Sequence, residues 1–183
     1  MTRTTLTLLC GIPGSGKSFL TGRLAGKVVS TDAMRKFLWG NESVVEHDRL
    51  VFDMAKLIID YVLSKKVSAV LDATNLTRRR RQTMIDIALR HQAGVTVVWI
   101  DCPLEVALAR NAVRDRKVPV PVIKALYKSI EEPDLNEGIN IIKVLNADKQ
   151  FKKIICPRGI LIREKYLFRQ EWPVQQRIKK IKI

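Results

Sequence analysis

The sequence predicts an α/β protein in which a mainly parallel β-sheet is flanked by helices. Short runs of β-branched and aliphatic residues alternate with longer stretches whose apolar residues recur at helical spacing. The apolar runs contain few polar residues, as expected of strands buried on both faces, and the connections between elements are short. With 183 residues, of which 46% are hydrophobic and 28% charged, the chain is long enough to form one domain with its own core.

The predicted elements alternate along the chain. Apolar runs predict strands at residues 4–10, 27–30, 67–71 and 95–100. Apolar spacing and capping residues, including Thr77 as an N-cap, predict helices at residues 18–25, 33–38, 43–63, 77–91, 104–114 and 120–132. Gly138 opens a last apolar run. Beyond residue 147 the pattern weakens, and residues 152–168 predict either a hairpin around Pro157-Arg158-Gly159 or a strand with an edge extension.

Charge and cysteine usage restrict the partners and the compartment. The formal net charge is +15, and the stretch from Lys149 to the end holds 11 basic and two acidic residues. A chain this basic favours DNA or RNA as a partner, and a solvated basic tail is the alternative for that stretch. Cys10, Cys102 and Cys156 show no metal-ligand spacing, which indicates reduced thiols and a cytoplasmic protein. No apolar run reaches the length of about 18 residues that a transmembrane helix needs, so no membrane partner is expected.

The clearest motif is GIPGSGKS at residues 11–18, which fits G-x-x-x-x-G-K-[ST] between a predicted strand and a predicted helix. Glycines let the backbone N–H groups face phosphate oxygens, Lys17 reaches the β- and γ-phosphates, and the Ser18 hydroxyl can ligate Mg²⁺. The sequence lacks the N-K-x-D of a GTPase, and no acid follows Asp72 to polarise water. The motif therefore predicts transfer from ATP (or GTP) to an acceptor. The nucleotide-binding residues are Gly11, Pro13, Gly14, Ser15, Gly16, Lys17 and Ser18.

Asp32 and Arg35 follow the second predicted strand, beside the phosphate loop. A carboxylate at this edge can accept the proton of an attacking hydroxyl, and an arginine one helical turn away can hold a phosphodiester or a carboxylate of the acceptor. In the alternative interpretation, Asp32 caps the short helix and Arg35 is exposed.

Two further groups of arginines stand out. Arg110 and Arg114 precede a proline-flanked link and predict a mobile lid that closes on the transferring phosphoryl group, although cations also stabilise a helix C-terminus without any such role. The run Arg78–Arg81 opposes the dipole at a helix N-terminus, so either carboxylates or nucleic-acid phosphates are expected nearby, and its function stays open.

Taken in order, the motifs GIPGSGKS, STDAMR, VLDATNLTRRRR and ARNAVRDRKVP resemble those of the P-loop polynucleotide 5′-hydroxyl kinases, from about Thr4 to Val144. The resemblance implies a nucleoside-kinase-like P-loop NTPase fold with a kinase domain over residues 1–147 and a basic extension of the same domain over 148–183. It implies phosphorylation of DNA or RNA 5′ ends with ATP and Mg²⁺.

The resemblance also implies roles for individual residues. Asp32 is the general base, Lys17 and Arg114 complete the catalytic set, and Arg110 joins Arg114 on the donor phosphates. On the acceptor side stand Arg35, which holds the acceptor's phosphate, and Asp72 and Asn75. Ser18 binds Mg²⁺, with Asp32 or Asp72 contributing through water.

Two other functions remain open. The same motifs occur in kinases of small-molecule hydroxyls or of aminoacyl-tRNA, and a non-catalytic, nucleotide-gated RNA-binding module would share the phosphate loop. The sequence does not choose between DNA and RNA, and it leaves the oligomeric state undetermined.

Overall fold

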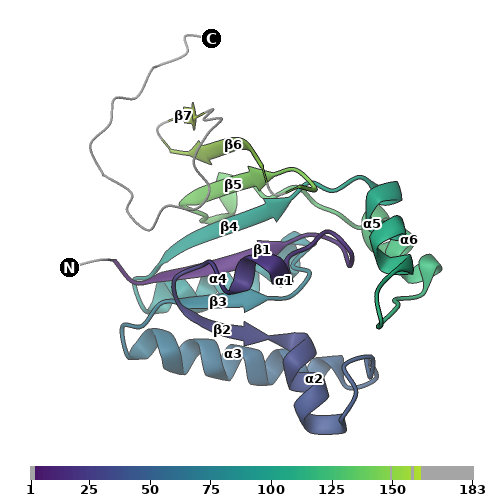
Figure 1. The fold of residues 1–183 in the computed structure, drawn as a ribbon. Helices are drawn as coiled ribbons and strands as arrows, with labels where there is room; N and C mark the ends of the chain where they lie inside the picture. The colour runs from purple at the N-terminus through teal and green to yellow at the C-terminus, as the bar shows by residue number, and fades with distance from the viewer. Residues whose placement is uncertain (1–2, 149, 158, 162–183) are drawn as a thin grey trace.

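A computed structural model describes residues 3–148, 150–157 and 159–161, which form a seven-stranded sheet in the order β2-β3-β1-β4-β5-β6-β7 (Figure 1). The five strands from β2 to β5 run parallel, whereas β6 pairs antiparallel with β5 and β7 antiparallel with β6. The predicted α/β class and parallel sheet are confirmed. The strands are β1 (Thr5–Cys10), β2 (Lys27–Ser30), β3 (Ala69–Asp72), β4 (Gly94–Ile100), β5 (Ile141–Leu145), β6 (Phe151–Cys156) and β7 (Gly159–Leu161).

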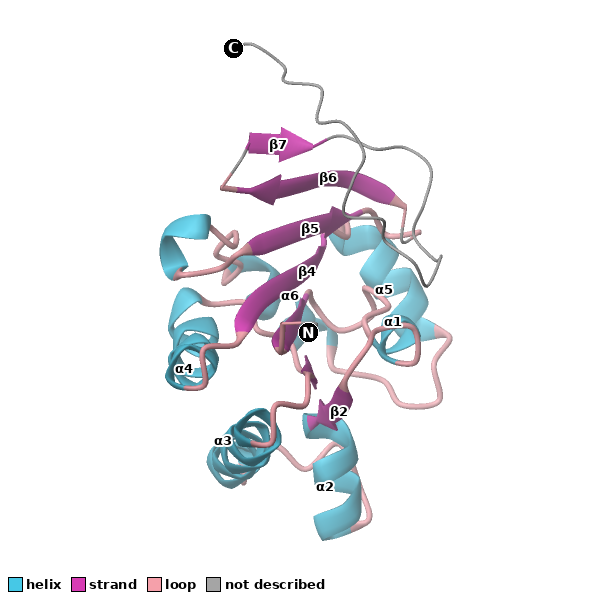
Figure 2. Ribbon diagram, turned by 90° about the vertical axis from the view of Figure 1, so that its left-hand side faces the viewer, coloured by secondary structure: helices cyan, strands magenta, loops and turns pink. Residues whose placement is uncertain are grey.

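Helices lie on both faces of this sheet. Figure 2 shows α3 and α4 side by side on one face and α1 and α5 on the other, while Figure 1 places α5 and α6 beyond the carboxyl ends of β1 and β4. The helices are α1 (Ser18–Thr21), α2 (Thr31–Trp39), α3 (Asp48–Ser64), α4 (Arg78–Arg90), α5 (Leu104–Ala112), α6 (Val120–Lys128) and the 3₁₀-helix η1 (Leu135–Glu137).

The core forms around β1, the central strand, which lies between β3 and β4. Leu6, Leu8 and Leu9 are completely buried because helices cover both faces of the sheet. Since β1, β2 and β3 are parallel, their carboxyl ends meet at one edge, where the phosphate loop, the start of α2 and Asp72 come together.

Two predicted helices have different starts or ends. The predicted helix 18–25 stops at Thr21, because the chain must return to β2 through Gly26, whose φ of +134° and close approach to Ser68 suit only glycine. The predicted helix 43–63 begins at Asp48, because the Asn41 side chain accepts a hydrogen bond from the Ser43 backbone and holds the preceding segment in a turn.

Two later helices end earlier than predicted, each because a side chain or backbone group bonds elsewhere. The helix 104–114 stops at Ala112, where both atoms of the Asn111 amide bond the backbone of Val118 at 2.9 Å and close the following loop. The helix 120–132 stops at Lys128, because the Glu131 backbone N–H donates to a carbonyl of the β3–α4 loop.

The hairpin predicted around residues 157–159 is confirmed as the β6–β7 pair. Because β6 adds to β5, the sheet continues past the predicted boundary at residue 147. Most of the predicted basic extension, residues 162–183, lies outside the described residues. Within the described part of the chain, no helix combines the length and apolar character needed to cross a membrane.

Candidate active site

The phosphate loop connects β1 to α1 and has a backbone that only glycine tolerates at key points. Gly14 and Gly16 adopt φ values of +83° and +94°, and a Cβ at Gly14 would lie 2.4 Å from the carbonyl oxygen of Ala107 in α5. The Gly11 N–H donates to Thr74 at 3.1 Å, which fixes the start of the loop against the end of β3. The loop is thus a preformed backbone cradle of the kind that binds phosphate.

Lys17 is held inside this cradle by the loop itself. Its Nζ donates to the carbonyls of Gly11 at 2.7 Å and Ile12 at 2.9 Å. Burial lowers the pKa of Lys17, and the nearby Asp72 carboxylate opposes that shift. The Ser15 hydroxyl is also buried and, among the described residues, has no hydrogen-bond partner. A buried cation and an unpartnered hydroxyl under a glycine-rich loop fit an anionic phosphate ligand.

Asp72, at the end of β3, lies beside Ser18. Burial raises the pKa of Asp72, whereas the Lys17 charge and a hydrogen bond from the Ser18 side chain lower it, and the Asp32 charge raises it further. A hydroxyl and a carboxylate are oxygen ligands suited to Mg²⁺, which usually keeps waters and phosphate oxygens as its other ligands. Among the described residues, no cluster of three or more metal-binding side chains occurs.

Asp32 lies in the first turn of α2, but Ser30 is the residue that caps this helix, since its hydroxyl accepts from the Ala33 backbone. Arg35 is only 6% exposed. The alternative interpretation, a capping Asp32 with an exposed Arg35, is therefore wrong. Asp32 instead faces the same edge of the sheet as Lys17 and Asp72, both of which feel its charge.

The Arg35 guanidinium pairs with two carboxylates. Nη1 donates to Asp32 Oδ1 at 2.6 Å, while Nε and Nη2 donate to Asp48 Oδ1 at 2.9 and 2.6 Å. In this arrangement Arg35 orients Asp32, and each guanidinium nitrogen donates to a carboxylate, while Nη1 and Nη2 each keep a second N–H. The structure thus shows Arg35 in contact with Asp32 and Asp48, and its contact with an acceptor phosphate stays a prediction.

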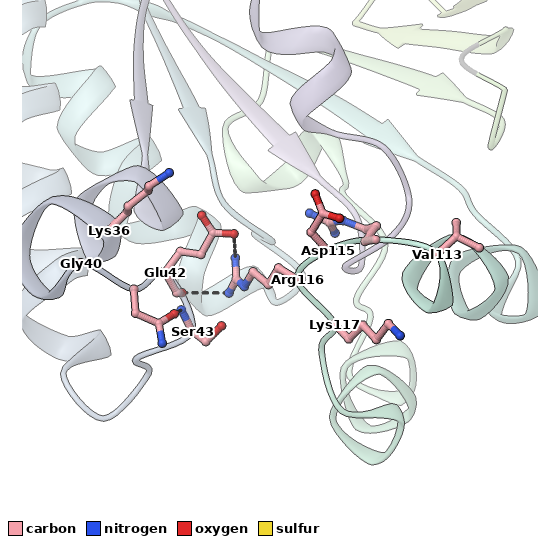
Figure 3. A pocket seen from close by; sticks show the side chains of 10 residues that line it. Lys36, Gly40, Glu42, Ser43, Val113, Asp115, Arg116 and Lys117 are labelled. Atoms are coloured by element: carbon pink, nitrogen blue, oxygen red, sulfur yellow. Dashed lines mark hydrogen bonds and ion pairs between the residues drawn. The ribbon is translucent and has the colours of Figure 1, made fainter.

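The loop between α5 and α6 reaches across to α2 through Arg116. Its Nη1 lies 2.8 Å from Asp32 Oδ2. Its Nη2 donates to the Glu42 carbonyl at 2.9 Å, and Figure 3 marks the interactions between Arg116 and Glu42 with dashed lines. Both oxygens of Asp32 are thus ion-paired. Between this loop and the end of α2 is an open cleft of about 810 Å³, lined by residues that include Lys36, Arg114 and Lys117.

The two predicted lid arginines point to different places. Arg114 is exposed, lines the cleft, and is close enough to the phosphate loop for its charge to lower the pKa of Lys17. Arg110 instead donates to the Ala147 carbonyl at 2.7 Å and to Asp148 at 3.0 Å, beside the end of β5. Because α5 ends at Ala112, the two arginines do not share a helical face.

Asn75 and Arg81 are structural. Asn75 is completely buried, and its amide nitrogen donates to the Leu9 carbonyl at 2.7 Å, so the predicted contact with the acceptor does not fit its position. Arg81 is buried in a two-bond ion pair with Glu137 at 2.8 and 2.7 Å. The Glu131 carboxylate accepts the first N–H of α4. Carboxylates thus offset part of the charge of the Arg78–Arg81 run.

The sequence did not reveal the carboxylate partners of Arg35 and Arg81. Asp48 and Glu137 are far along the chain from Arg35 and Arg81, and nothing in their spacing signals the pairing. Asn111 had a signal, because it lies within the arginine motif before a proline-flanked link, where an amide that closes a loop is common.

Comparison with known families places the chain. A family model described as an AAA domain (AAA_33) matches residues 6–133, well over half of the sequence. The chain belongs to this AAA domain family. Together with the phosphate loop, membership of the AAA domain family identifies a P-loop kinase, which implies ATP and Mg²⁺ as cofactors.

Curated relatives of this AAA domain protein include L-seryl-tRNA(Sec) kinases. The enzyme from Methanococcus maripaludis is 26% identical, with 80% of this chain and 68% of that protein covered. The mouse enzyme is 28% identical over 43% of this chain and 22% of its own length.

Solved structures share the fold. A chain of the Pnkp1/Rnl/Hen1 RNA repair complex matches 70% of this protein and 44% of its own length with a TM-score of 0.60 and 21% identity. A gluconokinase from Sinorhizobium meliloti 1021 matches 80% and 85% with a TM-score of 0.57 and 18% identity. At these identities the likeness concerns the fold alone, so it does not select polynucleotide ends over other hydroxyls.

Proposed function

We propose that this protein transfers the γ-phosphoryl group of ATP to the seryl hydroxyl of an aminoacyl-tRNA. The observation that carries the choice of acceptor is the pairing of Arg35 with Asp32 and Asp48, in which each guanidinium nitrogen donates to a carboxylate. A 5′-hydroxyl kinase of the resembled family would use this arginine on the acceptor's phosphate, whereas a seryl hydroxyl has no adjacent phosphate to hold. The similarity to the archaeal seryl-tRNA kinase and the net charge of +15 support the same choice.

The arrangement suits phosphoryl transfer. The loop N–H groups and Lys17 bind the donor phosphates, and Ser18 with Asp72 would hold Mg²⁺, which neutralises charge that develops in the transition state. Asp32 accepts the proton of the seryl hydroxyl as its oxygen forms a bond to the γ-phosphorus and the bond to ADP breaks. For this step Arg116 must release Asp32 Oδ2, and Arg114, at the cleft, is placed to approach the phosphates.

A second candidate is phosphorylation of DNA or RNA 5′-hydroxyl ends. It is favoured by Asp32 and Arg35 beside the phosphate loop, the pattern that resembles the polynucleotide kinases, and it requires Arg35 to leave its carboxylates when the acceptor binds.

The decisive experiment follows label from [γ-³²P]ATP into seryl-tRNA, 5′-hydroxyl oligonucleotides and a panel of small alcohols. We expect labelled seryl-tRNA, and no label on uncharged tRNA or on tRNA charged with alanine, since neither presents the seryl hydroxyl. Asp32→Asn, Lys17→Ala and Arg114→Ala should each reduce the rate by about 10²-fold or more, the range for loss of a base or of an electrostatic contact to the phosphates. Label on 5′-hydroxyl ends alone would select the second candidate.

Arg35 separates the two candidates kinetically. If Arg35 orients Asp32, Arg35→Ala lowers kcat and leaves the KM for the acceptor nearly unchanged, because the base loses its alignment. If Arg35 binds an acceptor phosphate, the same substitution raises that KM. Lys65→Ala, at the exposed C-terminal end of α3 and away from the cleft, is the control and should change neither constant.

A further inference from the structure

A second concave surface, which the phosphate chemistry does not use, lies between α3 and the N-terminal turns of α4. It has a volume of about 660 Å³ and is lined by basic and aromatic side chains. These are Arg49, Phe52 and Lys56 of α3 and Arg79 and Arg80 of α4, which we call the α3–α4 groove. Figure 2 shows the two helices packed on the same face of the sheet.

The acidic side chains of the α3–α4 groove already have partners. Asp48 accepts from Arg35, and Glu131 accepts the N–H of Arg78. Among the ion pairs of the described residues, Arg49 and Arg79 form none, whereas Lys56 is paired with Asp53 at 2.8 Å. The groove therefore carries a net positive charge, of which Glu131 offsets only part, and a net positive charge favours an anionic ligand.

The α3–α4 groove also offers a stacking surface. The Arg80 guanidinium lies over the Phe52 ring, 4.6 Å from its centre, and Phe52 is half-buried against the core, so the ring holds the exposed guanidinium in place. Unpaired bases stack on aromatic rings and on guanidinium planes, and phosphates bind the neighbouring arginines. Small anionic metabolites would use the charge but would leave the stacking surface empty.

The position of the groove relates it to the acceptor. Asp48 lines the groove and holds Arg35, which in turn holds Asp32, each contact being 2.6 Å long. The groove thus opens directly beside the carboxylate that receives the hydroxyl proton. Two ion pairs, Asp48–Arg35 and Arg35–Asp32, connect the groove to that carboxylate.

We propose that the α3–α4 groove binds the single-stranded 3′ end of the RNA that carries the acceptor hydroxyl, with a base stacked on the Arg80 guanidinium that Phe52 supports, and phosphates on Arg49 and Arg79. This proposal rests on the proposed function, because it supplies the site for the nucleotides next to the seryl group.

Binding of a fluorescein-labelled, single-stranded octaribonucleotide to the full chain, measured by anisotropy at several salt concentrations, tests the groove without catalysis. We expect the double variant Arg49→Gln/Arg79→Gln to raise Kd by about tenfold or more and to reduce the slope of log Kd against log salt by about 1.4, since each phosphate contact to a single strand contributes about 0.7. Phe52→Leu keeps the packing but loses the stack, and should raise Kd about tenfold with an unchanged salt slope.

The matched control is Lys124→Gln/Lys128→Gln, which removes the same charge from exposed positions of α6. Unchanged binding of a fluorescent ATP analogue shows that each variant is folded. If the groove variants bind the oligonucleotide as the control does, the groove proposal is overturned. If wild type binds through the groove but does not phosphorylate seryl-tRNA, the groove stands and the proposed function fails.

Discussion

The buried ion pair between Arg81 and Glu137 holds the loop that underlies the active site, and its removal gives a sharp test of the structure. The Arg81 guanidinium makes two bonds to Glu137 and, through Nη1, donates to the carbonyls of Asn75, Leu76 and Glu131 at 3.2, 3.1 and 2.9 Å. Both side chains of the pair are at most 1% exposed. This network fixes the β3–α4 loop, which also contacts the start of the phosphate loop.

In Glu137→Gln the guanidinium stays buried without a countercharge. Breaking a buried pair by removing one partner costs about 3–5 kcal/mol, which is a large share of the about 5–15 kcal/mol by which a domain of this kind is stable. We expect a loss of free energy of unfolding in that range, measured by urea denaturation with tryptophan fluorescence. Glu132→Gln, an exposed acid nearby, is the control and should cost less than about 0.5 kcal/mol.

A double variant, Arg81→Met/Glu137→Leu, removes both charges and should recover much of the lost stability, because no unpaired charge remains. If Glu137→Gln were within about 1 kcal/mol of the Glu132→Gln control, the ion pair would not have the buried geometry described here and the reasoning would fail.

Three further changes probe the nucleotide site. Asp72→Asn should raise the Tm of the nucleotide-free protein at pH 7 and weaken binding of Mg²⁺·ATP. Because the folded protein keeps the Asp72 proton to a higher pH than the unfolded chain does, the stability of the wild type falls as the pH rises above the ordinary aspartate range. The gain in Tm of the variant should therefore vanish toward about pH 4. Gly14→Ala should abolish binding of a fluorescent ATP analogue and cost about 1–3 kcal/mol, whereas Gly22→Ala, with open space around it, should do neither. Arg116→Ala should speed hydrogen–deuterium exchange of residues 113–118, and equal exchange in both proteins would argue against the bridge to α2.

The elements that were predicted well are those whose signal is local. The strands around β1 are continuous apolar runs, and the phosphate loop has a fixed spacing of glycines, so both could be located from the sequence. Helix ends were misjudged where a group bonds to a distant segment, as Asn111 does with Val118 and Glu131 with Leu76. The helical spacing of apolar residues does not reveal such long-range hydrogen bonds.

The same limit applies to the site. Asp32 and Asp72 could be placed at one edge of the sheet because each directly follows or ends a parallel strand. The burial of Arg35 depends on Asp48, which α3 brings in from thirteen residues away, and only the folded chain reveals that contact. Whether an arginine faces solvent or a carboxylate depends on such tertiary partners. That environment in turn decides whether the arginine can bind a ligand.

The double ion pairing of Asp32 has a consequence for the kinase in the absence of an acceptor. In the resting geometry Arg35 and Arg116 each pair with one oxygen of Asp32, so the carboxylate already has two partners when a water molecule enters beside bound nucleotide. An acceptor that displaces Arg116 would free Asp32 Oδ2 to accept the proton of the hydroxyl. We therefore expect the resting geometry to slow the hydrolysis of bound ATP by water while no acceptor is present.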